Sequence, residues 1–277
     1  MYQIVGLINR FMYGSSQDAG STVATWHVQG RYRGETESME EENSESRSSN
    51  MDSNNNNEEP DFIPTNLKLV IILSGKRKSG KDHISTLITN YIGHERMPYL
   101  AILRIAGPIK KEFARNNRLD FTRLLDSSGY KENFRMAMVQ WSEEYREKEG
   151  WNCFLKQAIK EQRAKDKAIW ILNDARRPCD LEYFDNDPAF LHTKILKLRI
   201  EATDEARMSR GWKFIEGIDD RETECGLDSY EDWTHIIDND YNDEKKLLAE
   251  FLRPVFDEID AVFKKLENEY IEPDISQ

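Results

Sequence analysis

Residues 67–93 read LKLVIILSGKRKSGKDHISTLITNYIG, and this stretch decides the fold. Its first part, Leu67–Leu73, is a short aliphatic and β-branched run, which predicts a buried strand. Its last part, from Asp82 to Gly93, carries apolar side chains at helical spacing, which predicts a helix: Ile84, Leu87, Ile88, Tyr91 and Ile92. A strand and a helix therefore flank a loop that is rich in glycine and basic residues.

That loop has the spacing of a phosphate-binding site. Gly75, then four residues, then Gly80-Lys81 match the Walker A pattern G-x-x-x-x-G-K. Glycines let the chain curl so that successive backbone N–H groups form an anion nest, and the helix N-terminus adds partial positive charge. Lys81 can reach the β- and γ-phosphates of a nucleotide, where phosphoryl transfer needs charge to be stabilised. Three further cations are hard to explain as an aid to solubility in an acidic chain: Lys76, Arg77 and Lys78.

One position departs from the generic pattern. Asp82 stands where Ser or Thr would normally hold Mg²⁺. An aspartate can bind Mg²⁺ directly or through water, because this ion prefers hard oxygen ligands. The alternative is a basic surface turn in which the aspartate only caps the helix. The strand on one side and the helix on the other favour the phosphate site.

Predicted strands and helices alternate along the rest of the chain. Further strands are expected at residues 100–105, 168–172, 194–200 and 235–237, the third of these with one exposed side. Further helices are expected at residues 110–118, 131–148, 151–163, 204–208 and 243–269, the last interrupted near Pro254. In the helix at 131–148, a stripe of Phe134, Met138, Trp141 and Tyr145 is interpreted as core. This alternation predicts an α/β fold of three layers, in which helices flank a central parallel sheet.

The N-terminal part has a different composition. Residues 35–60 read ETESMEEENSESRSSNMDSNNNNEEP, with almost nothing apolar. Such a segment cannot bury enough surface to offset the loss of chain entropy, so we expect it to be disordered. We therefore predict a tail over residues 1–63 and a single P-loop domain over residues 64–272.

Charge and composition exclude several classes of function. The net charge of −12 argues against general binding of nucleic acid or of an anionic membrane, because both need a basic face. No apolar run approaches the roughly 18–20 residues of a membrane span. Three scattered cysteines argue against a disulfide framework and a zinc site and favour a reducing compartment: Cys153, Cys179 and Cys225. The C-terminal Asp-Ile-Ser-Gln is not a peroxisomal signal, and we expect a cytosolic location. We also expect a monomer.

A second motif follows the strand predicted at residues 168–172. Asp174-Ala175-Arg176-Arg177 lies at its carboxyl end, where side chains of a parallel sheet point into a ligand crevice. Asp174 resembles a Walker B carboxylate that could position Mg²⁺, and the two arginines suit bidentate contacts with phosphate. The alternative is a solvated turn that holds a local Asp–Arg pair.

Further arginines precede Gly211-Trp212. Arg207 and Arg210 share one helical face, and Arg199 lies just before them. An arginine-bearing lid that closes over ATP is the functional hypothesis, and a charged exposed helix face is the alternative. The middle segment adds basic residues whose spacing does not show which of them face an acceptor phosphate: Lys110, Lys111, Arg123, Lys131, Arg135 and Arg146.

Together these motifs resemble the animal-type phosphomevalonate kinase family from about residue 67 to about residue 252. The resemblance is carried by GKRKSGKD at 75–82, RLLDSSGYKE at 123–132, the Asp174…Arg176-Arg177 turn, RGW at 210–212 and ECGLD at 224–228. It implies a nucleoside-monophosphate-kinase-like P-loop fold. It also implies transfer of phosphate from ATP to (R)-5-phosphomevalonate with Mg²⁺, in isoprenoid and sterol synthesis. In that family an aspartate at position 82 is expected.

The same resemblance implies roles for individual residues. Lys81, Asp82, Arg176 and Arg177 match catalytic positions. The ATP site matches Lys76, Arg77, Lys78, Ser79, Gly80, Lys81, Asp82, Arg207, Arg210 and Asp240. The acceptor site matches Asn239, Lys110, Lys131, Arg135 and Arg146, and the metal candidates are Asp82 and Asp174.

Two other functions stay open at this point. One is a kinase of the same fold that acts on a nucleoside monophosphate or another phosphorylated metabolite, since only the acceptor pocket would differ. The other is a nucleotide-binding scaffold without turnover, which recruits partners through its tail. The intact Lys81, Asp82, Asp174 and arginine lid argue against the scaffold.

Overall fold

The computed structural model describes residues 64–125, 129–240 and 244–271. The tail predicted at residues 1–63 lies outside the described residues, as does residue 272 at the predicted end of the domain. The division of the chain at residues 63 and 64 therefore stays a prediction.

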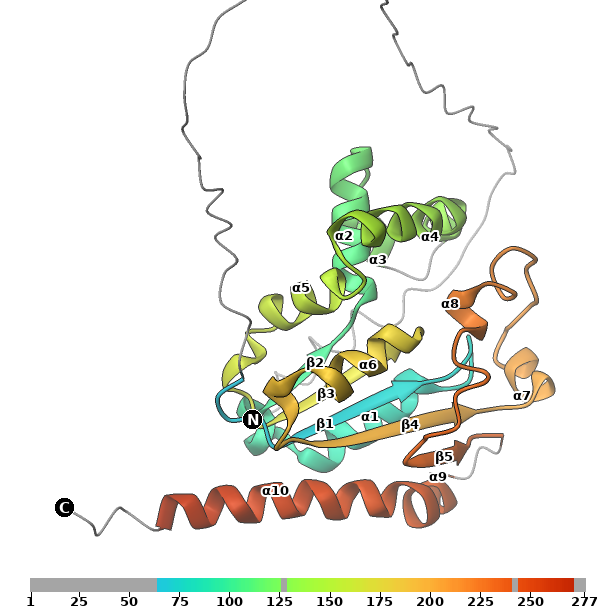
Figure 1. The fold of residues 1–277 in the computed structure, drawn as a ribbon. Helices are drawn as coiled ribbons and strands as arrows, with labels where there is room; N and C mark the ends of the chain where they lie inside the picture. Colours follow the sequence, from blue (N-terminus) through green and yellow to red (C-terminus); the bar gives the residue numbers. More distant parts are fainter. Residues whose placement is uncertain (1–63, 126–128, 241–243, 272–277) are drawn as a thin grey trace, which may run out of the picture. The chain divides into compact units, whose positions relative to one another are not determined.

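A five-stranded parallel sheet forms the centre of the fold (Figure 1). The strands follow the order β2-β3-β1-β4-β5, with these bounds: β1 Leu69–Ser74, β2 Leu100–Leu103, β3 Ile169–Ala175, β4 Lys194–Glu201 and β5 His235–Asp238. Because every neighbouring pair is parallel, the carboxyl ends of all five strands lie at one edge of the sheet. The predicted parallel sheet is confirmed, with strand ends that differ by a few residues.

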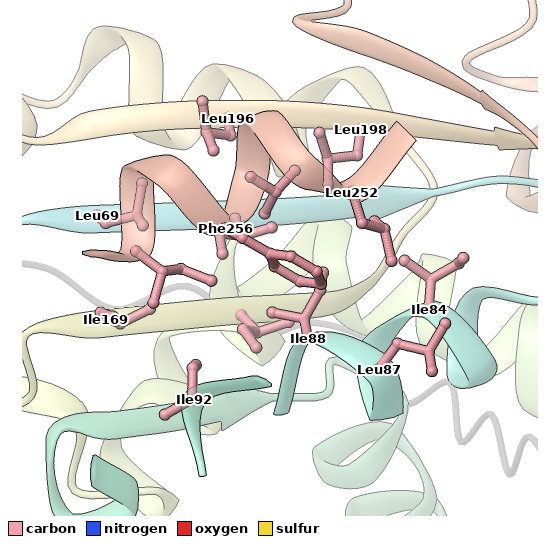
Figure 2. Close-up of a cluster of buried hydrophobic side chains, with 14 of the residues drawn as sticks. Leu69, Ile84, Leu87, Ile88, Ile92, Ile169, Leu196, Leu198, Leu252 and Phe256 are labelled. Atoms are coloured by element: carbon pink, nitrogen blue, oxygen red, sulfur yellow. The ribbon is translucent and has the colours of Figure 1, made fainter. Parts of the chain in front are cut away.

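Helices cover both faces of this sheet, which confirms the predicted three layers. On one face, α1 (Lys81–Ile92) and α10 (Arg253–Ile271) pack against the strands, and Figure 2 shows part of this cluster. On the other face lie α5 (Cys153–Glu161) and α6 (Pro178–Asn186). The central strand has apolar residues on both sides, as a buried parallel strand requires: Leu69, Ile71 and Leu73 on the first face, Val70 and Ile72 on the second.

The long connection between β2 and β3 carries a helical subdomain. It contains α2 (Ala106–Asn117), α3 (Phe121–Leu125), α4 (Gly129–Glu149) and then α5. A separate small core holds α2, α3 and α4 together: Phe113, Ala114, Leu124 and Met138. The predicted stripe on α4 packs against this core and the sheet cluster, so its interpretation as core is confirmed.

Two features differ from the sequence prediction. Helix α6 follows β3 directly and was not expected, because the residues before it, Asp174–Arg177, were interpreted only as a phosphate and metal motif. Strand β4 has no exposed side along its middle, since Lys197 and Arg199 are both buried. They are paired there: Lys197 Nζ donates to Asp185 Oδ2 at 2.8 Å, and Arg199 Nη2 to Asp228 Oδ1 at 2.7 Å.

The C-terminal helical stretch changes type where an interruption was predicted. A short α9 (Glu244–Lys246) passes into a π-helical turn, Leu247–Leu252, before α10 begins. Pro254 lies in the first turn of α10, where the missing N–H of proline costs little. None of the helices in the described ranges is long and apolar enough to cross a membrane.

Candidate nucleotide and phosphate site

The loop between β1 and α1 needs glycine at two positions. Gly75 has φ 151° and Gly80 has φ 104°, both in the region that side chains rarely adopt. A Cβ on Gly75 would lie 2.3 Å from the Ile200 carbonyl oxygen, and a Cβ on Gly80 would lie 2.1 Å from Asn239 Nδ2. The backbone of β4 and the side chain of Asn239 therefore lie so close to the loop that a Cβ at either glycine would clash.

Replacing Gly80 by Ala is expected to weaken nucleotide binding at least tenfold. The new methyl group would displace the Asn239 amide, which donates to the Ser79 carbonyl oxygen at 2.8 Å. The left-handed backbone adds about 1–2 kcal/mol of strain. Calorimetric titration with an ATP analogue measures the effect.

Gly93→Ala is the matched control for this variant. Gly93 also has a positive φ, of 78°, but a Cβ there meets nothing within 4 Å. The control should lower thermal stability and leave nucleotide affinity unchanged. Equal losses of affinity in the two variants would contradict the role given to the Asn239 contact.

Lys81 lies at the start of α1 and bends back over the loop. Its Nζ donates to the carbonyl oxygens of Gly75 and Lys76, the latter at 3.0 Å. Burial and then the nearby Arg176 lower the pKa of Lys81 well below its ordinary value, against the opposing effect of Glu224 and other carboxylates. An arriving phosphate would supply the missing negative charge and stabilise the protonated amine.

Two of the predicted loop cations are held by carboxylates from a distant segment. Lys76 Nζ lies 2.7 Å from Asp228 Oδ2, and Arg77 Nη1 lies 2.8 Å from the buried Asp219 Oδ2. Burial alone would raise the pKa of Asp228, but hydrogen bonds and ion pairs with Lys76 and Arg199 hold this pKa below its ordinary value. The sequence did not predict either carboxylate as a partner of the loop.

The two lid arginines both reach the loop. Arg207, in α7 (Asp204–Ser209), donates from Nε to the Arg77 carbonyl oxygen at 2.8 Å, and its guanidinium lies 3.8 Å above the Trp212 ring. Arg210 donates from Nη1 to the Ser79 carbonyl oxygen at 3.2 Å and from Nη2 to that of Asn239. These contacts set the predicted arginines over the loop.

A cavity of about 630 Å³, which we call the loop cavity, opens beside the loop. It is lined by residues from the loop and from the ends of β4 and β5. Four residues predicted for the ATP site line it: Lys76, Ser79, Arg207 and Asp240. Asn239, which the family resemblance assigns to the acceptor, lies against the loop at Ser79.

A second cavity, of about 240 Å³, is lined by cations together with apolar side chains, and we call it the basic cavity. It lies among α2, α4 and the turn after β3. Six basic residues line it: Lys110, Lys131, Arg135, Arg146, Arg176 and Arg177. These include all four lysines and arginines of the middle segment that were assigned to the acceptor site.

Several cations of the basic cavity lack full compensation. Burial, and then the nearby Lys131, lower the pKa of Lys110, against the effect of Asp174. Buried guanidinium nitrogens of three arginines have no hydrogen-bond partner among the described residues: Arg146 Nε, Arg176 Nη1 and Arg177 Nε. Two of them lie near carboxylates, Arg176 Nη1 at 2.8 Å from Glu224 and Arg177 Nε at 3.8 Å from Glu222. Buried polar groups are normally satisfied, so this pattern indicates room for an anion.

Other contacts hold these side chains in place. Arg135 makes two hydrogen bonds to Glu132, at 2.7 and 2.6 Å. Arg177 Nη2 donates to Glu143 Oε1 at 3.0 Å, and Arg146 Nη1 donates to the Trp151 carbonyl oxygen at 2.5 Å. Packed and paired cations keep a fixed arrangement, which favours recognition of one anion geometry.

Glu224 joins the loop to the basic cavity. One of its oxygens, Oε2, accepts the backbone N–H of Arg77 at 2.9 Å. The same oxygen lies 2.8 Å from Arg176 Nη1, an ion pair that is not aligned for a hydrogen bond. The predicted catalytic Arg176 is therefore adjacent to the loop.

The two metal candidates have different surroundings. Asp82 is exposed, with 82% of its side-chain surface accessible, so its carboxylate is free to meet a ligand. Both oxygens of Asp174 accept backbone N–H groups, from Ile105 and Ala106, at 2.8 Å each. Burial raises the pKa of Asp174, and these N–H groups oppose the shift. The described residues hold no cluster of three His, Cys, Asp or Glu, so other metal ligands would come from phosphate oxygens or water.

Comparison with known proteins gives matches over the domain that carries this site. A family model described as "Phosphomevalonate kinase" matches residues 73–190. The phosphomevalonate kinase of Drosophila melanogaster is 36% identical over 169 residues, which cover 61% of this chain and 86% of the relative.

Solved structures with similar folds include two other kinases. A gluconokinase from Sinorhizobium meliloti is 13% identical with a TM-score of 0.31, covering 75% of this chain and 98% of the other. A thymidylate kinase from Ehrlichia chaffeensis is 15% identical with a TM-score of 0.31, covering 71% and 99%. Scores this low say nothing about function, so the sequence relatives decide the family.

Proposed function

Because the chain belongs to the phosphomevalonate kinase family, we propose that it is an ATP-dependent kinase that phosphorylates (R)-5-phosphomevalonate. The products would be 5-diphosphomevalonate and ADP. The observation that carries the proposal is the basic cavity beside the phosphate-binding loop, in which six lysine and arginine side chains converge. A substrate that already bears a phosphate is the acceptor that such a cavity suits.

Each cavity then has one substrate. The loop amides and Lys81 hold the ATP phosphates, with the nucleoside in the loop cavity. Arg176, Arg177 and the lysines of the basic cavity hold the acceptor phosphate. The lid arginines Arg207 and Arg210 cover the loop through hydrogen bonds to its carbonyl oxygens. Glu224 keeps Arg176 next to the loop, so the two phosphates meet there.

In the chemical step, an acceptor phosphate oxygen forms the new bond to the γ-phosphorus. The bond between that phosphorus and the β–γ bridging oxygen breaks, and ADP leaves with the electron pair. No general base is needed, because the second pKa of a phosphate ester is about 6 and the attacking oxygen is already an anion. Lys81 and the arginines stabilise the charge that moves to the bridging oxygen.

A divalent metal accompanies ATP in this class of enzyme, and we propose Mg²⁺. Asp82 suits it, as an exposed carboxylate one position after Lys81, and Asp174 is the second candidate. When bound, Mg²⁺ neutralises charge on the β- and γ-phosphates. A cytosolic location and a monomeric state stay predictions from the sequence.

Coupled release of ADP, with ATP and Mg²⁺, tests the function. The assay compares 5-phosphomevalonate with a panel of nucleoside monophosphates. We expect rapid turnover with 5-phosphomevalonate alone. Turnover with a nucleotide instead would keep the ATP site and overturn the acceptor. Binding of ATP without turnover on any acceptor would favour the scaffold hypothesis.

A further inference from the structure

The end of β3 contains a bulge directly in front of the phosphate-binding loop. Ile72 of β1 pairs with Leu172, but the next paired residue, Ser74, lies opposite Ala175. β3 therefore uses three residues where β1 uses two. Bulges of this kind commonly redirect side chains next to active sites.

Two adjacent polar side chains at this bulge point to opposite faces of the sheet. Ile169 and Ile171 belong to the cluster that packs against α1, and alternation sends Asn173 to the same face. Asp174 faces the other way, where it accepts the N–H groups at the start of α2. The residue that faces the phosphate-binding helix is thus Asn173.

Asn173 makes a direct contact with the metal candidate Asp82. Its Nδ2 donates to Asp82 Oδ1 at 2.9 Å, and the Asn173 residue is only 3% exposed. Its other polar atom, Oδ1, is buried and has no hydrogen-bond partner in the part of the chain that the structure describes. Arg104 Nη2 also approaches Asp82 Oδ1, at 3.7 Å, but both of these side chains are exposed. An exposed ion pair contributes little.

The chemistry of these groups explains why an amide stands at this position. A serine or threonine at position 82 has an O–H that can donate to a carboxylate on the facing strand. An ionised aspartate has only acceptors, so its facing partner must donate. Asp82 and Asn173 satisfy this requirement, because the amide of Asn173 donates to the Asp82 carboxylate.

From this contact we infer that Asn173 is a positioning residue, which fixes the Asp82 carboxylate for the metal–nucleotide complex. This inference rests on one part of the proposed function, which is that the protein binds a metal ion together with a nucleotide. The Asn173 Oδ1 atom supports the same role, because a buried hydrogen-bond acceptor can orient a water molecule that the metal would hold. The role lies in holding Asp82.

The test measures metal binding without the acceptor. The affinity of Mn²⁺ for the protein–ADP complex is determined by electron paramagnetic resonance in wild type, Asn173→Ala and Arg104→Met. We expect Asn173→Ala to weaken Mn²⁺ binding about tenfold, as for other outer partners of metal ligands. Arg104→Met, which removes the exposed neighbour of Asp82, should bind Mn²⁺ as wild type does. Thermal unfolding and metal-free ADP binding check that both variants are folded.

A reciprocal exchange provides the second test. Asn173→Asp is made beside the native Asp82 and beside Asp82→Ser, and the metal-free proteins are compared by thermal unfolding. Beside serine, the new carboxylate receives an O–H, and the double variant should be more stable than Asp82→Ser alone. Beside Asp82, two carboxylates meet without a donor, and the protein should be less stable than wild type.

Two outcomes would overturn the inference. One is wild-type affinity for Mn²⁺ in folded Asn173→Ala. The other is an equal effect of Asn173→Asp in both backgrounds, because a donor–acceptor exchange requires opposite effects. A wild-type protein that binds Mn²⁺ and ADP but does not phosphorylate 5-phosphomevalonate would refute the proposed acceptor and leave this inference standing.

Discussion

Lys81→Met is expected to lower kcat by about 10²–10³-fold, which corresponds to about 2.7–4 kcal/mol of transition-state stabilisation. The amine now donates to the carbonyl oxygens of Gly75 and Lys76, within the curve that would receive the phosphates. Removing it leaves the backbone amides in place, so ATP still binds while the charge that develops during transfer loses its nearest cation. Steady-state ADP release with saturating ATP and acceptor measures the loss.

The positive charge of Lys81 does not help to stabilise the folded state. Since burial lowers its pKa in the empty protein, the protonated amine is disfavoured by folding, and its removal leaves stability unchanged or slightly raised. Thermal unfolding of Lys81→Met should therefore match wild type. Lys264→Met, on the exposed side of α10, is the control for the loss of a lysine. Turnover of Lys81→Met within threefold of the control would contradict the mechanism.

Arg176→Met is expected to lower kcat/KM for the acceptor about 100-fold, or about 2.7 kcal/mol. Arg176 lines the basic cavity and lies 2.8 Å from Glu224, so its loss removes a proposed contact with the acceptor phosphate and deprives a buried carboxylate of its ion-pair partner. Truncating one partner of a buried charge pair costs about 2–5 kcal/mol in comparable cases. Initial rates over a range of 5-phosphomevalonate concentrations measure the change.

The effect of Arg176→Met should be specific to one substrate. KM for ATP should change less than about threefold, because the loop cavity does not include Arg176. Arg115→Met is the matched control, since Arg115 lies on α2 with 72% of its side chain exposed. Equal changes for ATP and acceptor would show that Arg176 acts on the loop as a whole.

Local pattern was enough to predict much of the fold. The strand at 69–74 is buried on both faces, and a continuous aliphatic run is what that environment selects. Helix α6 was not predicted because its sequence signal is limited to its first turn. That signal consists of Pro178 at the first position and Asp180, which accepts the backbone N–H of Arg177. β4 was misjudged because its buried Lys197 and Arg199 look like a solvated face until their distant partners are known.

The candidate site also contains residues that the sequence predicted and residues that it did not. The motif at 75–82 is local, and its geometry follows from the glycines that it contains. The sequence predicted the basic residues of α2 and α4 as candidates from their residue type alone. Only the fold shows that they lie in one cavity with Arg176 and Arg177. Asn173, Asp219 and Glu224 carry no spacing signal, since each acts on a residue at least 91 positions away. Such partners are set by tertiary structure, and one sequence does not reveal them.

The order of the strands separates the two substrates along the chain. The loop cavity is built from residues that follow β1, β4 and β5. The wall of the basic cavity comes largely from the β2–β3 connection, at residues 105–146, and Arg176 and Arg177 complete it. Under the proposed function, acceptor preference is encoded in this one insertion between two strands, and nucleotide use is encoded elsewhere. Evolution, or an engineer, can exchange that insertion to create kinases for new phosphorylated metabolites while the ATP machinery is inherited intact.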